Sequence, residues 1–447
     1  MAKKKEVISR IGNILKTATA AHKQEVGAGG SVYDPYLSHV RSMRLPSLGL
    51  MDMLGFTGIR DSCTVLIDGA PGSHKSSFGI EMFNWGYNYG VGGAIVDCEN
   101  KAAVDIAMGT LTEETLWLPG HLIMMTAANV EDAQSALQGF VAKCAKMNEG
   151  VPREQQIPIM TLLDPLAGVP SKETIKQVLT KNDGAADRGH GGRVEALLWS
   201  IWLKVHEQSI IELPFISIFV NHVKSRQKQG TGSISIMEQY NPGGSSQNYA
   251  TTIAFRCSPG KSFLSEAYGG KNYNEVWIKC AKNSRGPTGK RTMVRKYWQP
   301  RKDGSTVFWW DWGRNTADFL SALQGKHPMR DILNVVKHTN EKYSCKQLKM
   351  KDVSPTVLGD TVLADEELMR QAIKILQLRE LKEFDSLSDE DHVQMQKFAH
   401  EAHLDHLKEA GMTLEDEEVP ELQGEDTGSE EEPEINLDDG FDDGEDL

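Results

Sequence analysis

The stretch Thr64-Val65-Leu66-Ile67-Asp68-Gly69-Ala70-Pro71-Gly72-Ser73-His74-Lys75-Ser76-Ser77 determines how the rest of the chain is interpreted. An apolar, β-branched run leads into a Gly-rich turn, and a Lys-Ser pair and a helix-like segment follow. A phosphate-binding loop requires this strand–loop–helix order, because backbone N–H groups and the helix N-terminus hold the phosphates. In such a loop Lys75 reaches the β- and γ-phosphates of a nucleoside triphosphate, and the Ser76 hydroxyl holds Mg²⁺.

The loop matches the pattern G-x-x-x-x-G-K-[ST] at Gly69, Lys75 and Ser76, whereas His74 stands where the pattern has Gly. Taken alone, the stretch is also compatible with an ordinary Gly-rich turn. The residues predicted to bind the nucleotide are Gly69, Ala70, Pro71, Gly72, Ser73, His74, Lys75, Ser76 and Ser77.

The composition predicts a globular protein without a membrane span. The chain has 447 residues, of which 39% are hydrophobic and 25% charged, and no apolar run reaches the length of a bilayer. No secretory apolar segment follows the basic start at Lys3. The scattered cysteines form no C-x-x-C pair, so reduced thiols inside a cell are expected for Cys63, Cys98, Cys144, Cys257, Cys280 and Cys345.

The net charge of −13 comes from one end of the chain. Residues 415–446 contain 17 acidic residues and no Lys or Arg, and without them the net charge becomes +4. A mildly basic body with an acidic tail is compatible with nucleic-acid binding.

Residues 46–312 alternate strand-like and helix-like segments, which predicts an α/β fold with a mostly parallel sheet covered on both faces. The predicted strands are 64–69, 93–98, 157–163 and 215–220, and the predicted helices are 76–89, 130–147 and 193–208. The runs 251–257, 275–280, 292–298 and 306–312 resemble strands joined by turns, and we expect them to extend the sheet as an antiparallel edge.

The remaining segments complete the predicted domain organisation. Residues 1–45 contain an amphipathic helix and a Gly-rich joint, and the core spans 46–325. Residues 326–412 are expected to form a small helical domain, with helices over 366–384 and 388–411. Residues 413–447 are expected to be a disordered acidic tail.

Polar side chains end three further predicted strands. Glu99 follows the second strand, Asp164 ends the third, and His222 follows the fourth. Because the carboxyl ends of parallel strands converge on a ligand, we expect these groups to meet at the phosphate loop. There Glu99 could deprotonate the attacking water, and Asp164 could hold Mg²⁺ directly or through water. A Glu at a strand end is equally compatible with an ordinary surface residue.

Two long stretches, 168–192 and 224–247, follow the third and fourth strands and are interpreted as functional loops. Basic, Gly-rich loops at the ligand end of a sheet could follow a nucleic-acid backbone, although solvated surface loops remain the alternative. The candidate DNA-binding residues are Lys172, Lys176, Arg188, Arg193, Lys224, Arg226, Lys228, Gly243 and Gly244.

In this order, the motifs resemble the RecA family of recombinases, most of all the UvsX-type recombinases of bacteriophages. The resemblance covers roughly residues 46–312 and is carried by 47–50, 69–76, 96–99, 163–168, 220–222, Gly243-Gly244 and 282–285. It implies that Glu99, Lys75 and His222 act in ATP hydrolysis with Mg²⁺ on Ser76 and Asp164. It also implies that Lys282 and Arg285 reach the γ-phosphate of a neighbouring subunit, and that His222 relays the nucleotide state to the second loop.

The resemblance implies an ATP-dependent recombinase that forms a helical filament of its own copies on single-stranded DNA and pairs it with homologous duplex. The implied partners are single- and double-stranded DNA, a single-stranded DNA-binding protein and a recombination mediator, in the host cytoplasm or a phage replication compartment. One alternative is a hexameric helicase or motor of the RecA fold, for whose usual N-terminal domain residues 1–45 leave no room. The other is a DNA-coating scaffold in which His74 has abolished turnover.

Overall fold

The computed structural model describes residues 41–87, 89, 91–99, 109–111, 122–156, 158–180, 188–211, 213–229, 235–240, 246–264, 272–300, 306–323 and 327–383. All the described residues belong to one of the chain's two units, Met1–Ala402. The predicted N-terminal helix, the helix over 388–411 and the acidic tail lie outside the described residues.

A nine-stranded sheet forms the centre of the first unit, in the order β13-β12-β11-β10-β3-β7-β6-β4-β5. The strands from β10 to β5 in this order pair in parallel, whereas β11, β12 and β13 pair antiparallel. This arrangement confirms the predicted α/β class and the antiparallel edge. The bounds are β3 Cys63–Gly69, β4 Gly92–Asp97, β5 Leu122–Thr126, β6 Ile159–Asp164, β7 Phe215–His222, β10 Ile253–Phe263, β11 Asn272–Asn283, β12 Arg291–Pro300 and β13 Thr306–Trp310.

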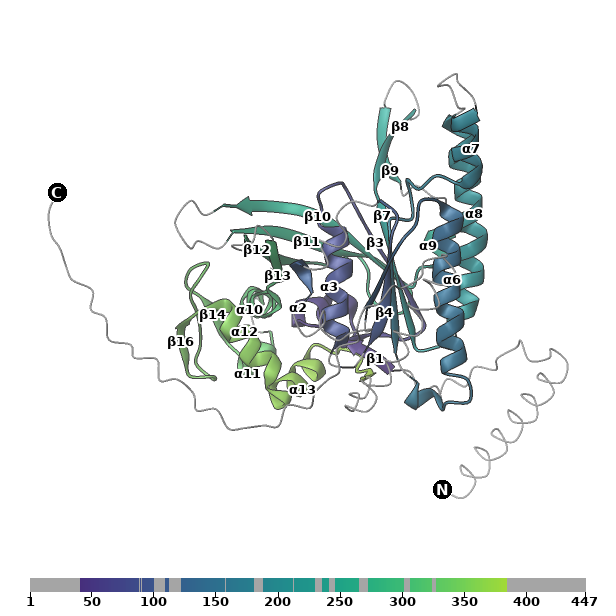
Figure 1. The fold of residues 1–447 in the computed structure, drawn as a ribbon. Coiled ribbons are helices and arrows are strands. Elements are labelled where there is room, and N and C mark those ends of the chain that lie inside the picture. Colours follow the sequence, from purple (N-terminus) through teal and green to yellow (C-terminus); the bar gives the residue numbers. More distant parts are fainter. Residues whose placement is uncertain are drawn as a thin grey trace, which may run out of the picture. The chain divides into compact units, whose positions relative to one another are not determined.

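Helices cover both faces of this sheet (Figure 1). Successive residues of a strand point to opposite faces, and β3 is mainly apolar, as expected for a strand whose residues are all buried. Ile67 packs in the same apolar cluster as Phe78 of helix α3 (Lys75–Tyr87). Leu66 packs in the cluster that holds Leu137 of α6 (Val130–Met147) and Trp199 of α8 (Arg188–Ile210).

Smaller elements surround the main sheet. Strand β1 (Arg41–Arg44) pairs with β2 (Gly58–Arg60) and with the late strand β17 (Lys382–Glu383), and α2 (Leu48–Leu54) begins at the N-cap Ser47. A short 3₁₀ helix, η2 (Arg153–Gln155), precedes β6.

The region after residue 326 is not the helical domain that we predicted. Its described part contains a three-stranded sheet of β14 (Val335–Lys337), β15 (Tyr343–Cys345) and β16 (Met350–Val353). Its helices are α11 (Met329–Ile332), α12 (Pro355–Ala364) and α13 (Glu366–Ile375), and α10 (Trp312–Ala322) precedes the region. The helix predicted over 366–384 ends at Ile375, because Gln377 adopts a left-handed φ of 52° and the Leu378 N–H turns back to the Ile373 carbonyl oxygen.

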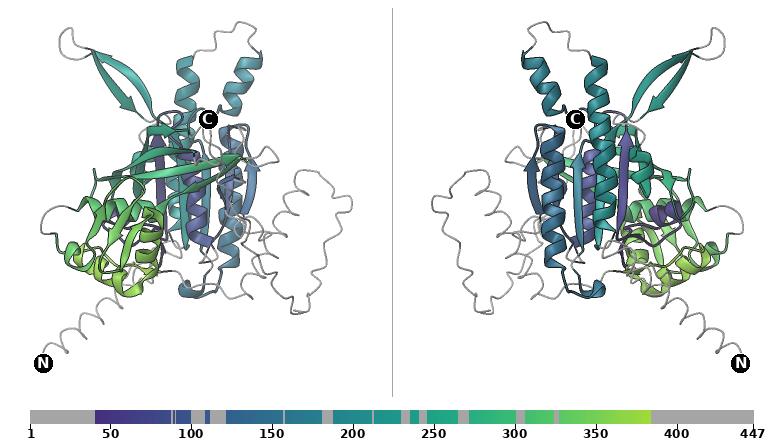
Figure 2. Two further views of the ribbon diagram at one scale, coloured as in Figure 1. Left: turned by 90° about the vertical axis from the view of Figure 1, so that its left-hand side faces the viewer. Right: turned by 90° about the vertical axis from the view of Figure 1, so that its right-hand side faces the viewer.

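The two predicted long loops also contain regular structure. The first includes α7 (Lys172–Thr180) and the first residues of α8, and the second contains a hairpin of β8 (Lys224–Gln229) and β9 (Ser235–Tyr240) before the short helix α9 (Ser246–Ala250). The hairpin and α7 project beyond the same end of the sheet (Figures 1 and 2). Strands β5 and β14–β16 were missed because they have only three to five residues, too few to give a clear pattern.

Among the described residues, no helix combines the length and the apolar character needed to cross a lipid bilayer.

Candidate nucleotide-binding site

The turn between β3 and α3, where the sequence predicts a phosphate loop, contains two residues with left-handed backbone. Gly72 and His74 have φ angles of 74° and 62°, a left-handed region that favours glycine. His74 thus adopts the conformation that glycine supplies in the usual pattern. A Cβ on Gly69 would lie 2.3 Å from the Cys257 carbonyl oxygen, so the loop and β10 approach too closely for any other residue there.

Lys75 is buried at the start of α3, and its Nζ donates a hydrogen bond of 2.8 Å to the Ala70 carbonyl oxygen. Burial lowers the pKa of Lys75, while the nearby carboxylates of Asp164 and Glu99 act in the opposite direction. The Lys75 ammonium group reaches across the loop to this carbonyl oxygen. It could instead bind an oxygen of a phosphate placed in the loop. The Ser73 hydroxyl, also buried in this loop, has no hydrogen-bond partner among the described residues.

Carboxylates from two neighbouring strands meet beside the loop. Asp97 at the end of β4 is the register partner of Asp164 at the end of β6, and its Oδ1 accepts a hydrogen bond of 2.9 Å from the Glu99 backbone N–H. Burial raises the pKa of Asp164 to about 6, a hydrogen bond with Ser76 opposes the rise, and Glu99 and Asp97 add to it. A buried carboxyl group with acidic neighbours is stabilised by a cation.

This set of side chains fits a magnesium ion that is held mainly by a nucleotide. No cluster of three or more His, Cys, Asp or Glu side chains within the described ranges could hold a metal ion by itself. Mg²⁺ at nucleotide sites takes only one or two protein ligands, and phosphate oxygens and water supply the others. Ser76 and Asp164, joined by a hydrogen bond, are the pair that could provide them.

Glu99 and His222 are in direct contact. His222 Nε2 lies 3.1 Å from Glu99 Oε1, and both side chains are partly exposed. His222 ends β7 as the register partner of Gly69, and the Val223 N–H donates to the Gly69 carbonyl oxygen over 3.0 Å. The contact therefore joins Glu99, the predicted general base, to the end of β7, which leads into β8.

The histidine in the loop is uncharged at neutral pH. Burial lowers the pKa of His74 to about 4, and the ammonium groups of Lys296 and Lys75 contribute to the shift. His74 therefore adds no positive charge to the phosphate site in the free protein.

The structure brings Lys75, Ser76, Glu99, Asp164 and His222 together as the sequence predicts. It places the two other predicted catalytic cations elsewhere, on the β11 side of the sheet. Lys282 Nζ donates to the backbone carbonyl of Asn248 in α9, and Arg285 is exposed in the turn after β11.

The predicted DNA-binding residues are distributed over helices and a hairpin. Lys172 and Lys176 lie on α7 and Arg193 on α8, all at or near the surface, and Lys172 Nζ is 2.7 Å from Asp132 Oδ1. Arg188 lies in α8, and Lys224, Arg226 and Lys228 occupy every second position of β8. Gly243 and Gly244 lie outside the described residues.

Sequence reasoning missed several polar residues around the site. Asp97 could have been found, because it ends a predicted strand as Asp164 does. Asn221 donates from Nδ2 to Gln247 Oε1 over 2.5 Å, and Arg256 forms a bidentate pair with buried Asp68 over 2.7 and 2.8 Å. Their partners are distant in sequence, so the pattern offered no signal for these contacts.

No family model matches this sequence, and no curated protein matches it. The structure defines an α/β protein whose large, mostly parallel sheet is flanked by helices and is compatible with a RecA-like core.

Proposed function

We propose that the protein is an ATP-dependent DNA recombinase of the RecA type, acting in the cytoplasm on single- and double-stranded DNA. The observation that carries the proposal is the cluster of Lys75, Ser76, Glu99, Asp164 and His222 at the ends of adjacent parallel strands. Ligands of open parallel sheets bind at this end of the strands.

ATP with Mg²⁺ supplies the phosphoryl group that is transferred to water. Lys75 would exchange the Ala70 carbonyl for phosphate oxygens, and Ser76 and Asp164 would hold the ion. Glu99 would orient the attacking water and accept its proton, with His222 keeping the carboxylate in position.

The contact between Glu99 and His222 also supports a link from the nucleotide to DNA. His222 is followed by the β8–β9 hairpin, whose strand β8 carries Lys224, Arg226 and Lys228. A change at the Glu99 carboxylate therefore acts on His222, two residues before this hairpin begins. Basic residues on projecting elements suit the phosphate backbone of a DNA strand.

An exposed apolar surface supports assembly of the protein with itself. Leu197, Ile201 and Val205 recur every four residues along α8, and each is more than half exposed. Tyr249 of α9, which is 83% exposed, follows the residue whose carbonyl binds Lys282. Exposed apolar side chains that lie together favour burial against another subunit. Lys282, which is predicted to act on a neighbouring subunit, lies next to this surface. A filament on single-stranded DNA is the assembly that we propose, with a single-stranded DNA-binding protein and a mediator as partners.

The deciding experiment measures ATP hydrolysis by the purified full-length chain with and without single-stranded DNA. We expect stimulation by DNA, loss of activity in Lys75→Ala and Glu99→Ala, and joint-molecule formation with homologous duplex only in the active protein. Electron microscopy with ATP and DNA tests the helicase alternative, for which rings replace filaments. Hydrolysis that DNA does not stimulate and that Lys75→Ala leaves unchanged would favour the scaffold.

A further inference from the structure

A cavity of about 620 Å³ lies beside the antiparallel strands, away from the candidate nucleotide site. Trp277 of β11 and Met293 of β12 line it, and they alternate with Val276 and Val294, which face the apolar core. The side chains of α10, among them Phe319, form the opposite wall. The cavity thus occupies the outer face of the sheet extension.

The lining is basic. Lys261, Arg291, Arg295 and Lys337 contribute four cations, against the carboxylates Glu275 and Asp318. Asp318 already accepts a hydrogen bond from Tyr343 and lies 3.5 Å from Lys337 Nζ. Arg295 is likewise paired with Glu341, so Lys261 and Arg291 against Glu275 leave the lining with a net charge of +1.

Apolar and aromatic groups lie between these cations. The Arg291 guanidinium is 4.6 Å from the centre of the Trp277 ring, and Phe319 and Met293 supply further apolar surface. Such a lining accommodates a large apolar side chain next to negative charges.

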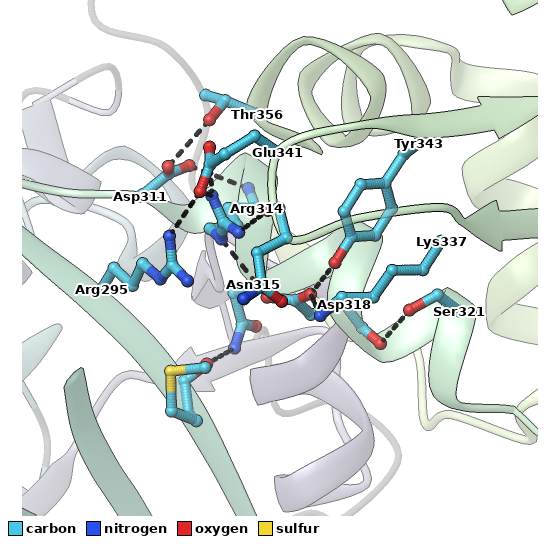
Figure 3. A network of polar contacts seen from close by, with 12 residues as sticks. Arg295, Asp311, Arg314, Asn315, Asp318, Ser321, Lys337, Glu341, Tyr343 and Thr356 are labelled. Carbon is cyan, nitrogen blue, oxygen red and sulfur yellow. Dashed lines mark hydrogen bonds and ion pairs between the residues drawn. The ribbon is translucent and has the colours of Figure 1, made fainter. Parts of the chain in front are cut away.

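A carboxylate already binds to arginines at this place. Arg295 Nη1 donates to Glu341 Oε1 over 3.0 Å, and Arg314 Nη1 donates to Glu341 Oε2 over 3.1 Å, as Figure 3 shows. Arg295 and Asn340, the neighbour of Glu341, both line the cavity. The side chains around the cavity thus hold a carboxylate between two guanidinium groups, through charge-assisted hydrogen bonds that are stronger than neutral ones.

We propose that this cavity docks the acidic C-terminal segment, residues 434–447, of a second copy of the chain. The segment Glu-Ile-Asn-Leu-Asp-Asp-Gly-Phe-Asp-Asp-Gly-Glu-Asp-Leu has seven acidic residues, no Lys or Arg, and an aromatic residue, Phe441, between two Asp pairs. Its negative charges and its Phe match the cations and the apolar lining. Glu275 in the wall can accept hydrogen bonds from peptide N–H groups, which a phosphate backbone does not offer, and this favours a peptide over a nucleic acid.

The test uses a fluorescent peptide of residues 434–447 and the full-length chain in which the seven acidic residues of this segment are changed to Asn or Gln. This change removes competition from the protein's own copies of the segment. We expect saturable binding that is at least about tenfold tighter than that of a peptide with the same seven residues neutralised. The peptide with Phe441→Ser binds at least about threefold more weakly.

Substitutions in the protein locate the site. Arg291→Glu and Lys261→Glu, both exposed and in the lining, each weaken binding about tenfold, whereas Lys146→Glu on the surface of α6 leaves it within about twofold. Circular dichroism shows which variants fold, and one folded lining variant is enough for the test.

Equal binding by the lining variants and Lys146→Glu overturns the proposal. So does a single-stranded oligonucleotide that binds through Arg291 and Lys261 while the peptide does not bind. Neither readout depends on ATP, so this result and that of the hydrolysis assay can be told apart.

Discussion

Replacement of Asp164 by Asn is expected to stabilise the nucleotide-free protein at pH 8. The rise of the Asp164 pKa from 3.8 to about 6 corresponds to about 3 kcal/mol of preference for the neutral carboxyl group in the folded state. The side chain keeps partial contact with solvent, so we expect one to two thirds of this value, about 1–2 kcal/mol. Asn retains an oxygen that can accept the Ser76 hydrogen bond and carries no charge to desolvate.

The sign of the pH dependence follows from the raised pKa. Above pH 6 the folded protein holds the buried charge at a cost, and this cost disappears as the carboxyl takes up a proton between about pH 6 and pH 4. The advantage of Asp164→Asn is therefore largest at pH 8 and small at pH 4, as measured by urea denaturation at both values. Mg²⁺-ATP should stabilise the wild type and leave the variant nearly unchanged, because the ion loses its carboxylate.

A matched control is Asp132→Asn. Asp132 is a half-exposed carboxylate whose pKa is lowered by a hydrogen bond from Lys172, so its replacement should reduce stability at pH 8 and not raise it. The reasoning is refuted if Asp164→Asn is no more stable than the wild type at pH 8, or if its advantage is the same at pH 4.

Three further predictions concern other parts of the chain. Glu99→Gln should lower kcat for ATP hydrolysis by about 10²–10⁴-fold and leave nucleotide affinity within about threefold, as shown by steady-state kinetics and a fluorescent nucleotide. Glu341→Ala should cost about 1–2 kcal/mol in urea denaturation, since it leaves two buried arginines without this carboxylate, whereas Glu367→Ala in an exposed pair should cost less than about 0.5 kcal/mol. Equal losses would contradict the argument from the two buried arginines. Deletion of residues 413–447 should strengthen duplex binding, mostly at low salt, and unchanged affinity there would count against competition by the acidic tail.

The sequence predicted the part of the fold in which apolar runs are long and continuous. Strands β3, β4, β6 and β7 were found within two residues at each end because strands buried on both faces contain mostly apolar residues. Helix α6 was found with the observed bounds, since Asn129 caps it and its apolar face repeats regularly. These elements also fix where Glu99, Asp164 and His222 lie.

The sequence was a poor guide where tertiary contacts override the local pattern. The basic stretch after Asp164 looked like a loop, yet it contains α7 and the start of α8, because polar helices at the surface lack a long apolar stripe. The sheet β14–β16 consists of strands of three or four residues, too short for alternation to show. Contacts such as Asp68 with Arg256 depend on strand register across the sheet, which local patterns do not encode.

The bond between Asn221 and Gln247 has a consequence for how this fold can change over time. These two buried amides close the base of the segment that contains the β8–β9 hairpin, one from the tip of β7 and the other from α9. The segment between Asn221 and Gln247 is thus held at both of its ends. Mutation can therefore lengthen, shorten or replace this segment without displacing the end of β7 that carries His222. Mutations in this segment can thus change what it binds while the neighbouring candidate nucleotide-binding site keeps its geometry.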